Sequence, residues 1–176
     1  MKVPAIGVGG VTAAALLAMG VSMGGFASAA PLPGDYTTLP IDPNIVTDSL
    51  AYSAAPPVQN PNGQPGVTEV YTHRDGTRQI STTIMVLPDP QSATASLNGS
   101  KAVNGQSQPA AVGSGGTIVS GSSPDGSKSV SVLTFTEGNA ATTVEFDGPK
   151  NDPATSPWIV EYGQKQDAAI KNQLAV

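Results

Sequence analysis

The stretch TIVSGSSPDGSKSVSVLTFTEGNAATTVEFD, residues Thr117–Asp147, decides the fold of this chain and predicts three consecutive antiparallel strands. Ser123-Pro124-Asp125-Gly126 suits a type I turn, because proline favours the second position of such a turn and glycine the fourth. Glu137-Gly138-Asn139 predicts the second turn, since Gly and Asn readily take positive φ. Lys128 to Thr136 is rich in β-branched and aromatic residues, which favour a strand.

The apolar residues of this central strand change sides along it. Val130 and Val132 point one way, whereas Leu133 and Phe135 point the other. Such a change of phase predicts either a β-bulge or a strand that helices bury on both faces.

A hairpin is predicted before the meander. Val67–Tyr71 and Thr77–Leu87 read as its strands, and the turn between them contains His73 and the reversal signal Asp75-Gly76. Apolar and polar residues alternate in the second strand, so it should bury one face. The residues expected on that face are Ile80, Thr82, Ile84 and Val86.

Two helices complete the predicted domain. Asp89 can cap a helix that begins at Pro90, and Ser156-Pro157 begins a C-terminal helix over about 157–174. Gly163 is a weak point of this second helix and costs ~1 kcal/mol relative to Ala. We therefore expect an α+β fold: an antiparallel sheet of about five strands, a hairpin plus a three-stranded meander, packed by two helices.

The first residues predict export. Lys2 is the only charge before Asp35, an apolar run follows it, and Ala27-Ser28-Ala29 has the form Ala-x-Ala. Residues 1–29 thus read as a signal peptide, with cleavage after Ala29 or Ala30. The alternative is a retained anchor, since the uncharged run is long enough to span a membrane. After cleavage we expect no stable membrane span and a secreted protein, extracellular or in the cell wall.

Composition divides the remaining chain. Residues 30–66 form a Pro-rich N-terminal arm, because 31–66 hold eight of the sixteen prolines. Residues 67–176 form the α+β domain. Removing Lys2 leaves seven basic and thirteen acidic residues, a net charge of −6, which argues against nucleic acid as a partner. The chain contains no Cys, so the fold is expected to be free of disulfides.

The sequence offers few residues for catalysis or metal binding. His73 is the only histidine, and its predicted tight turn favours an exposed residue over a catalytic base. One His and no Cys do not supply the ligands of a zinc site. Glu145 and Asp147 fall on the expected wet face of a strand, where solvated charge is favoured over a carboxylate pair for glycoside hydrolysis. We predict no catalytic residue, no metal and no cofactor.

A family resemblance accompanies these patterns. The export signal, the absence of Cys and the Ala-, Gly-, Pro-, Thr- and Val-rich composition resemble small exported proteins of mycobacteria and related actinobacteria. TIMVLPD at residues 83–89, running into Ala93 and Leu97, is similar to the strand-then-helix of exported domains such as the PknH-type sensor and the LpqN-like lipoproteins. The meander and the closing helix at 166–171 also fit.

This resemblance covers about residues 67–174. The chain lacks the Cys pairs of the sensor type and the lipidated Cys of the lipoproteins. The resemblance implies an α+β sandwich with a binding or accessory role in the cell envelope, and it carries over no functional residue.

We expect a non-enzymatic exported protein that binds an unidentified ligand or protein of the envelope. The expected surface is the groove between sheet and helices near Trp158, Tyr162 and Phe135, with core packing as the alternative for the first two. One alternative function is a secreted hydrolase with a non-standard active site. Another is an extracellular signalling or adhesion module whose Pro-rich arm is recognised by a partner.

Overall fold

The computed structural model describes residues 34–47, 49–98 and 105–174. The predicted signal peptide at 1–29 and its cleavage site lie outside these ranges. Within them, no helix combines the length and the apolar character needed to cross a membrane.

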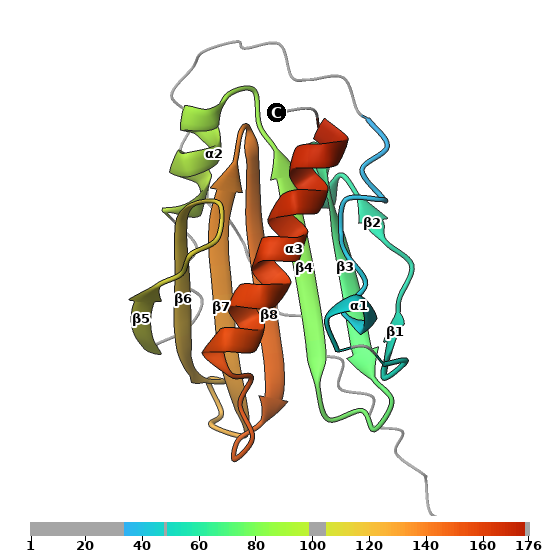
Figure 1. The fold of residues 1–176 in the computed structure, drawn as a ribbon, viewed down its shortest axis with the longest axis vertical. Coiled ribbons are helices and arrows are strands. Elements are labelled where there is room, and N and C mark those ends of the chain that lie inside the picture. The colour runs from blue at the N-terminus through green and yellow to red at the C-terminus, as the bar shows by residue number, and fades with distance from the viewer. Residues whose placement is uncertain (1–33, 48, 99–104, 175–176) are drawn as a thin grey trace, which may run out of the picture.

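One antiparallel sheet of eight strands dominates the described part of the chain (Figure 1). Its strand order is β1-β3-β4-β8-β7-β6-β5, and β2 also pairs with β3. The strands are β1 Tyr52–Ala54, β2 Val58–Gln59, β3 Gly66–His73, β4 Gln79–Val86, β5 Gly105–Pro109, β6 Ser114–Ser122, β7 Lys128–Glu137 and β8 Ala140–Pro149. The helices are α1 Asn44–Thr47, α2 Pro90–Leu97, α3 Ser156–Leu174 and the short 3-10 turn η1 Pro61–Gly63.

The predicted sheet of about five strands packed by two helices is wrong, because the described residues form eight strands and three α-helices. The unforeseen strands are β1, β2 and β5, which come from Pro-, Gly- and Gln-rich sequence. Their register explains how such sequence forms strands: β5 pairs with β6 alone, and β1 and β2 pair with β3 alone. A strand with one partner tolerates proline and polar residues on its free side. The third helix, α1, is a single turn within residues 39–50, a segment whose Asp42-Pro43 start favours a short helix or docked turn.

Two groups of strands meet in the middle of the sheet. Strands β1 to β4 form one group and β5 to β8 the other, and β4 pairs with β8 from Gln79↔Asp147 to Val86↔Ala140. We refer to this β4–β8 pairing as the seam. The burial of alternate residues along β4 confirms the predicted inward face from Ile80 to Val86.

The main core lies between one face of the sheet and α3, which crosses that face in Figure 1. The sheet contributes residues such as Ile84, Leu133 and Val144, and α3 contributes Ile159 and Ile170. Three apolar residues of the Pro-rich arm also belong to this core: Tyr36, Leu39 and Ile41. The division of the chain at residue 66 stays a prediction, yet the described arm packs directly on the sheet domain.

The second face of β7 is buried as well. Val130 and Val132 are only 7% and 4% exposed, yet they lie outside the main core cluster. Their alternation with Leu133 and Phe135 places them on the opposite face of the sheet. Helix α2, capped by the Asp89 carboxylate, contacts β7 and β8. Burial on both faces explains the change of phase seen in the sequence.

Gly163 of α3 packs closely against Leu133 of β7 and Val112. A Cβ atom built there would lie 2.5 Å from Leu133 Cδ2 and 3.0 Å from both γ-carbons of Val112. The glycine predicted as a weak point of the helix therefore permits its close packing.

Candidate ligand pocket

The structure separates the three residues that the sequence proposed for binding. Phe135 and Tyr162 are fully buried, and Trp158 is half-buried. The Trp158 and Tyr162 rings have centroids 6.0 Å apart, and both contact Phe146 edge-on at 5.3 and 5.5 Å. Phe135 lies elsewhere, against Gly113. Of the three, Trp158 belongs to the lining of the pocket described next, and a binding role for the other two stays a prediction.

An open pocket of about 250 Å³ lies at the end of the sheet where α3 begins. Its residues come from α1, β1, β4, β8 and the start of α3. They are Thr47, Tyr52, Arg78, Gln79, Ile80, Phe146, Asp147, Ala154, Thr155 and Trp158.

The floor of the pocket is the sheet itself. Ile80 and Phe146 face each other across the seam, so their side chains lie on the same face as α3. Gln79 and Asp147 also face each other across the seam. Because side chains alternate along a strand, those two side chains point to the other face. The residues left around the opening are therefore aromatic and aliphatic, with two threonines and one arginine.

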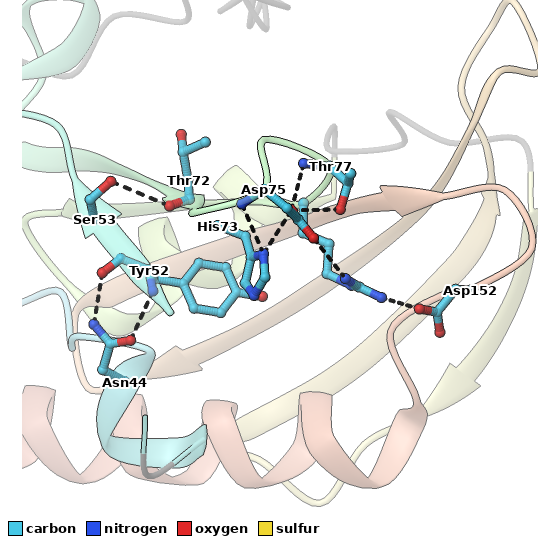
Figure 2. Close-up of polar contacts among 9 residues, drawn as sticks. Asn44, Tyr52, Ser53, Thr72, His73, Asp75, Thr77 and Asp152 are labelled. Carbon is cyan, nitrogen blue, oxygen red and sulfur yellow. Dashed lines mark hydrogen bonds and ion pairs between the residues drawn. The ribbon is translucent and has the colours of Figure 1, made fainter. Parts of the chain in front are cut away.

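Tyr52 forms a second aromatic wall of the pocket and is fixed at its backbone (Figure 2). The Asn44 side chain accepts from the Tyr52 backbone N–H at 2.9 Å and donates to the Tyr52 carbonyl at 2.9 Å. The Tyr52 ring packs edge-on against His73, with centroids 5.1 Å apart. Burial raises the pKa of Tyr52, so its hydroxyl remains protonated and neutral. Contacts within the protein thus hold this wall in place.

His73 is not the exposed turn residue that the sequence predicted. It ends β3, and its side chain is 25% exposed. Its Nδ1 lies 2.7 Å from Asp75 Oδ1, so the imidazole is held by both a carboxylate and an aromatic ring. The prediction failed because Tyr52, which covers His73, lies in the arm and could not be placed from local sequence.

Arg78 is held between two carboxylates at the rim of the pocket. Its guanidinium bonds to Asp152, and its Nη1 lies 3.9 Å from Asp75 Oδ2. Asp75 also accepts from the backbone N–H and the hydroxyl of Thr77, both at 2.8 Å. The bonds from Thr77, together with the one from His73, hold the pKa of the Asp75 carboxyl well below its usual range. Asp75 therefore stays ionised at neutral pH, and the guanidinium of Arg78 is paired with the carboxylates of Asp152 and Asp75.

Of the residues that line the pocket, the sequence predicted only Trp158 as a binding residue. Tyr52, Asn44 and Arg78 lie far from Trp158 in sequence, and no motif connects them. The one available signal was a Tyr in a Pro-rich segment that has few aromatic residues. In the described ranges, no three His, Cys, Asp or Glu side chains gather in a way that could hold a metal ion.

Comparison with known proteins gives one structural likeness. No family model matches the chain, and no curated protein matches it. Among solved structures, the chain is similar to the extracellular domain of PknH from Mycobacterium tuberculosis. The two share 10% identity with a TM-score of 0.49, over 77% of this chain and 94% of that one.

The neighbour belongs to the PknH type that the sequence resembles, but a TM-score of 0.49 carries no argument about fold or function. At such low identity it transfers no functional residue to this chain. The resemblance to LpqN-like lipoproteins stays a prediction.

Proposed function

We propose that this protein is an exported, non-enzymatic binding protein that holds a small ligand in the pocket between Tyr52 and Trp158. The observation that carries the proposal is a pre-formed opening with aromatic walls. Its export is supported by the signal-peptide pattern of residues 1–29.

Contacts within the protein position both walls. Asn44 and His73 fix Tyr52, and Trp158 is fixed by its edge-on contact with Phe146. A pocket whose walls are already ordered loses little conformational entropy on binding. Mostly apolar lining with a few polar groups is the usual character of small-molecule sites.

The lining also supports a role without catalysis. None of the described residues around the pocket is His, Lys, Ser or Cys, and the Asp147 side chain points to the other face of the sheet. His73 does not belong to this lining, and the Tyr52 ring packs edge-on against its imidazole. No nucleophile with an activating base is present in this lining.

Trp158 is the only tryptophan of the chain, so its fluorescence reports on this pocket directly. The proposal is tested with the neutral fluorescent probe N-phenyl-1-naphthylamine, by energy transfer from Trp158. We expect saturable binding, weakened about tenfold or more by Tyr52→Ala, because one aromatic wall is lost.

A matched control is Val58→Ala, which truncates an exposed apolar residue of the arm outside the pocket. It should bind the probe like the parent protein. Absence of saturable binding, or equal loss in both variants, would contradict the proposed pocket. Thermal melting of each variant shows that the fold is intact.

A further inference from the structure

Resting on the proposed function, we infer that the ligand of this pocket is a neutral, hydroxyl-rich ring: a single sugar residue, free or at the end of a glycan. The charges around the opening, its size and its aromatic walls support this class over the alternatives.

An anionic ligand does not suit the rim. Arg78 is the one cationic side chain in the lining, and it is bonded to Asp152 and close to Asp75. The guanidinium is therefore already occupied by protein carboxylates. A carboxylate or phosphate would have to displace Asp152 from the guanidinium before binding it. The acidic chain as a whole, at −5, repels anions further.

A cationic ligand is not favoured either. Aromatic faces such as those of Tyr52 and Trp158 do attract cations. However, the guanidinium of Arg78 shares this lining, and like charges repel at close range. The two nearby carboxylates are already occupied by Arg78, and Asp147 points to the opposite face.

A neutral sugar ring suits both the aromatic walls and the polar groups around the opening. One face of a pyranose carries C–H groups, which pack on aromatic rings such as Trp158 and Tyr52. Its rim carries hydroxyls, which can bond to Thr47, Thr155 and Arg78 around the opening. The guanidinium has five N–H donors in a fixed plane, and its carboxylate partners hold that plane in place.

The size of the opening sets how much of a glycan it can take. At about 250 Å³ it falls just below the usual range of roughly 300–1,000 Å³ for drug-sized ligands. It therefore accommodates one ring, while the open side leaves room for a chain to continue into solvent.

The experiment uses three matched monosaccharides that differ in charge: methyl glucoside, glucosamine and glucuronate. Each competes with N-phenyl-1-naphthylamine on the full chain, and the displacement is followed by energy transfer from Trp158. Methyl mannoside, methyl galactoside and N-acetylglucosamine extend the neutral set. We expect a neutral sugar to displace the probe about tenfold more effectively than either charged form.

The outcomes separate the two proposals. If the probe binds but no neutral sugar displaces it, or a charged sugar does so better, the sugar inference is overturned and the pocket stands. If neither the probe nor any sugar binds saturably, the proposed binding function of the pocket is also contradicted.

A charge variant tests the reasoning directly. Asp152 is exposed, so Asp152→Asn should fold normally, and it removes one of the two charges that compensate Arg78. Competition by glucuronate should then improve about tenfold relative to methyl glucoside. The control is Glu161→Gln, which removes an exposed carboxylate on α3 outside the pocket. Equal preference in Asp152→Asn and the parent would overturn the role given to Asp152.

Discussion

The two halves of α3 differ in what lies against them, although they share one inward face. Near its start, Trp158 faces the open pocket. One and two turns later, Tyr162 and Gln166 are fully buried. The difference comes from the arm: Gln166 accepts from the Ile41 backbone N–H at 3.0 Å and donates to the Leu39 carbonyl at 2.7 Å. The arm segment at 39–41 therefore fills the groove over one half of the helix, while the other half stays accessible.

The largest expected effect comes from removing the side chain that joins the arm to the closed half. Gln166→Ala leaves the Ile41 N–H and the Leu39 carbonyl without their buried partner. We expect a loss of about 3 kcal/mol in the free energy of unfolding, measured by chemical denaturation. The arm should also become sensitive to proteolysis.

The matched control for that change is Gln173→Ala. Gln173 makes the same kind of paired contact with the arm, through the Thr38 hydroxyl and carbonyl, but at an exposed position. Its loss should cost at most about 0.5 kcal/mol. Equal effects of the two variants would show that burial does not distinguish the two contacts.

Gly163→Ala probes the close approach of α3 to the sheet in the closed half. The new methyl group would crowd Leu133 and Val112, and this overpacking should outweigh the gain in helix propensity. We expect a net loss of about 1–2 kcal/mol by denaturant titration. Lys165→Ala, at an exposed position of α3, is the control. If Gly163→Ala stabilised the protein, Gly163 would not be needed for close packing, and its only effect would be its low helix propensity.

Tyr162→Phe tests whether the buried hydroxyl holds the arm. That hydroxyl lies 2.9 Å from Thr82 Oγ1 and donates to the Ile41 carbonyl at 3.3 Å. We expect a loss of about 1 kcal/mol, since Thr82 is left without this partner. A double-mutant cycle with Thr82→Val isolates the pair, and perfect additivity would argue against it.

The smallest expected effect lies at the flank of α3 opposite the arm, where Glu137, Asp167 and Lys171 meet. Lys171 Nζ lies 2.7 Å from Asp167 Oδ2 and 3.4 Å from Glu137 Oε2. Burial, helped by the neighbouring Asp167, raises the pKa of Glu137, and Lys171 only partly opposes this.

For a carboxyl whose pKa is raised on folding, the ionised form costs stability at neutral pH. That cost disappears as the pH falls below the unfolded value of 4.5. Glu137→Gln should therefore stabilise by a few tenths of a kcal/mol at pH 7, roughly the scale of a part-exposed pair, and give no gain at pH 4. Melting temperatures at both pH values test this. A gain that is independent of pH would contradict the stated cause.

Local sequence patterns predicted the central strands of the sheet but not the strands at its edges. The strands that became β3, β4, β6, β7 and β8 carry β-branched residues between Gly- and Pro-containing turns, which is a strong local signal. β1 and β5 have no such signal, because Tyr-Ser-Ala and Gly-Gln-Ser-Gln-Pro become strands only through a neighbouring strand.

The pocket could be predicted only in part for the same reason. Trp158 is the one tryptophan and lies at the start of a helix, which drew attention to it. Its spacing of four residues from Tyr162, however, favoured core packing for both. Asn44 and Tyr52 acquire their roles through contacts that no local pattern encodes. The prolines of the arm predicted extended chain over most of it, with a short helix or docked turn at 39–50. They did not predict that Leu39 and Ile41 are core residues.

Pairing of β4 with β8 along the seam should form more slowly than the strand pairings on either side of it. Within each group of strands, neighbours in the sheet are neighbours or near neighbours in the chain, so short loops close them. Pairs such as Ile80↔Phe146 instead join residues far apart in sequence, and that loop-closure entropy must be overcome before the contact forms. The two groups of strands, β1 to β4 and β5 to β8, should therefore form early. Their pairing along the seam should then be the rate-limiting step. In stopped-flow refolding, Val144→Ala should slow folding, whereas Ser107→Ala at the β5 edge should leave the folding rate unchanged.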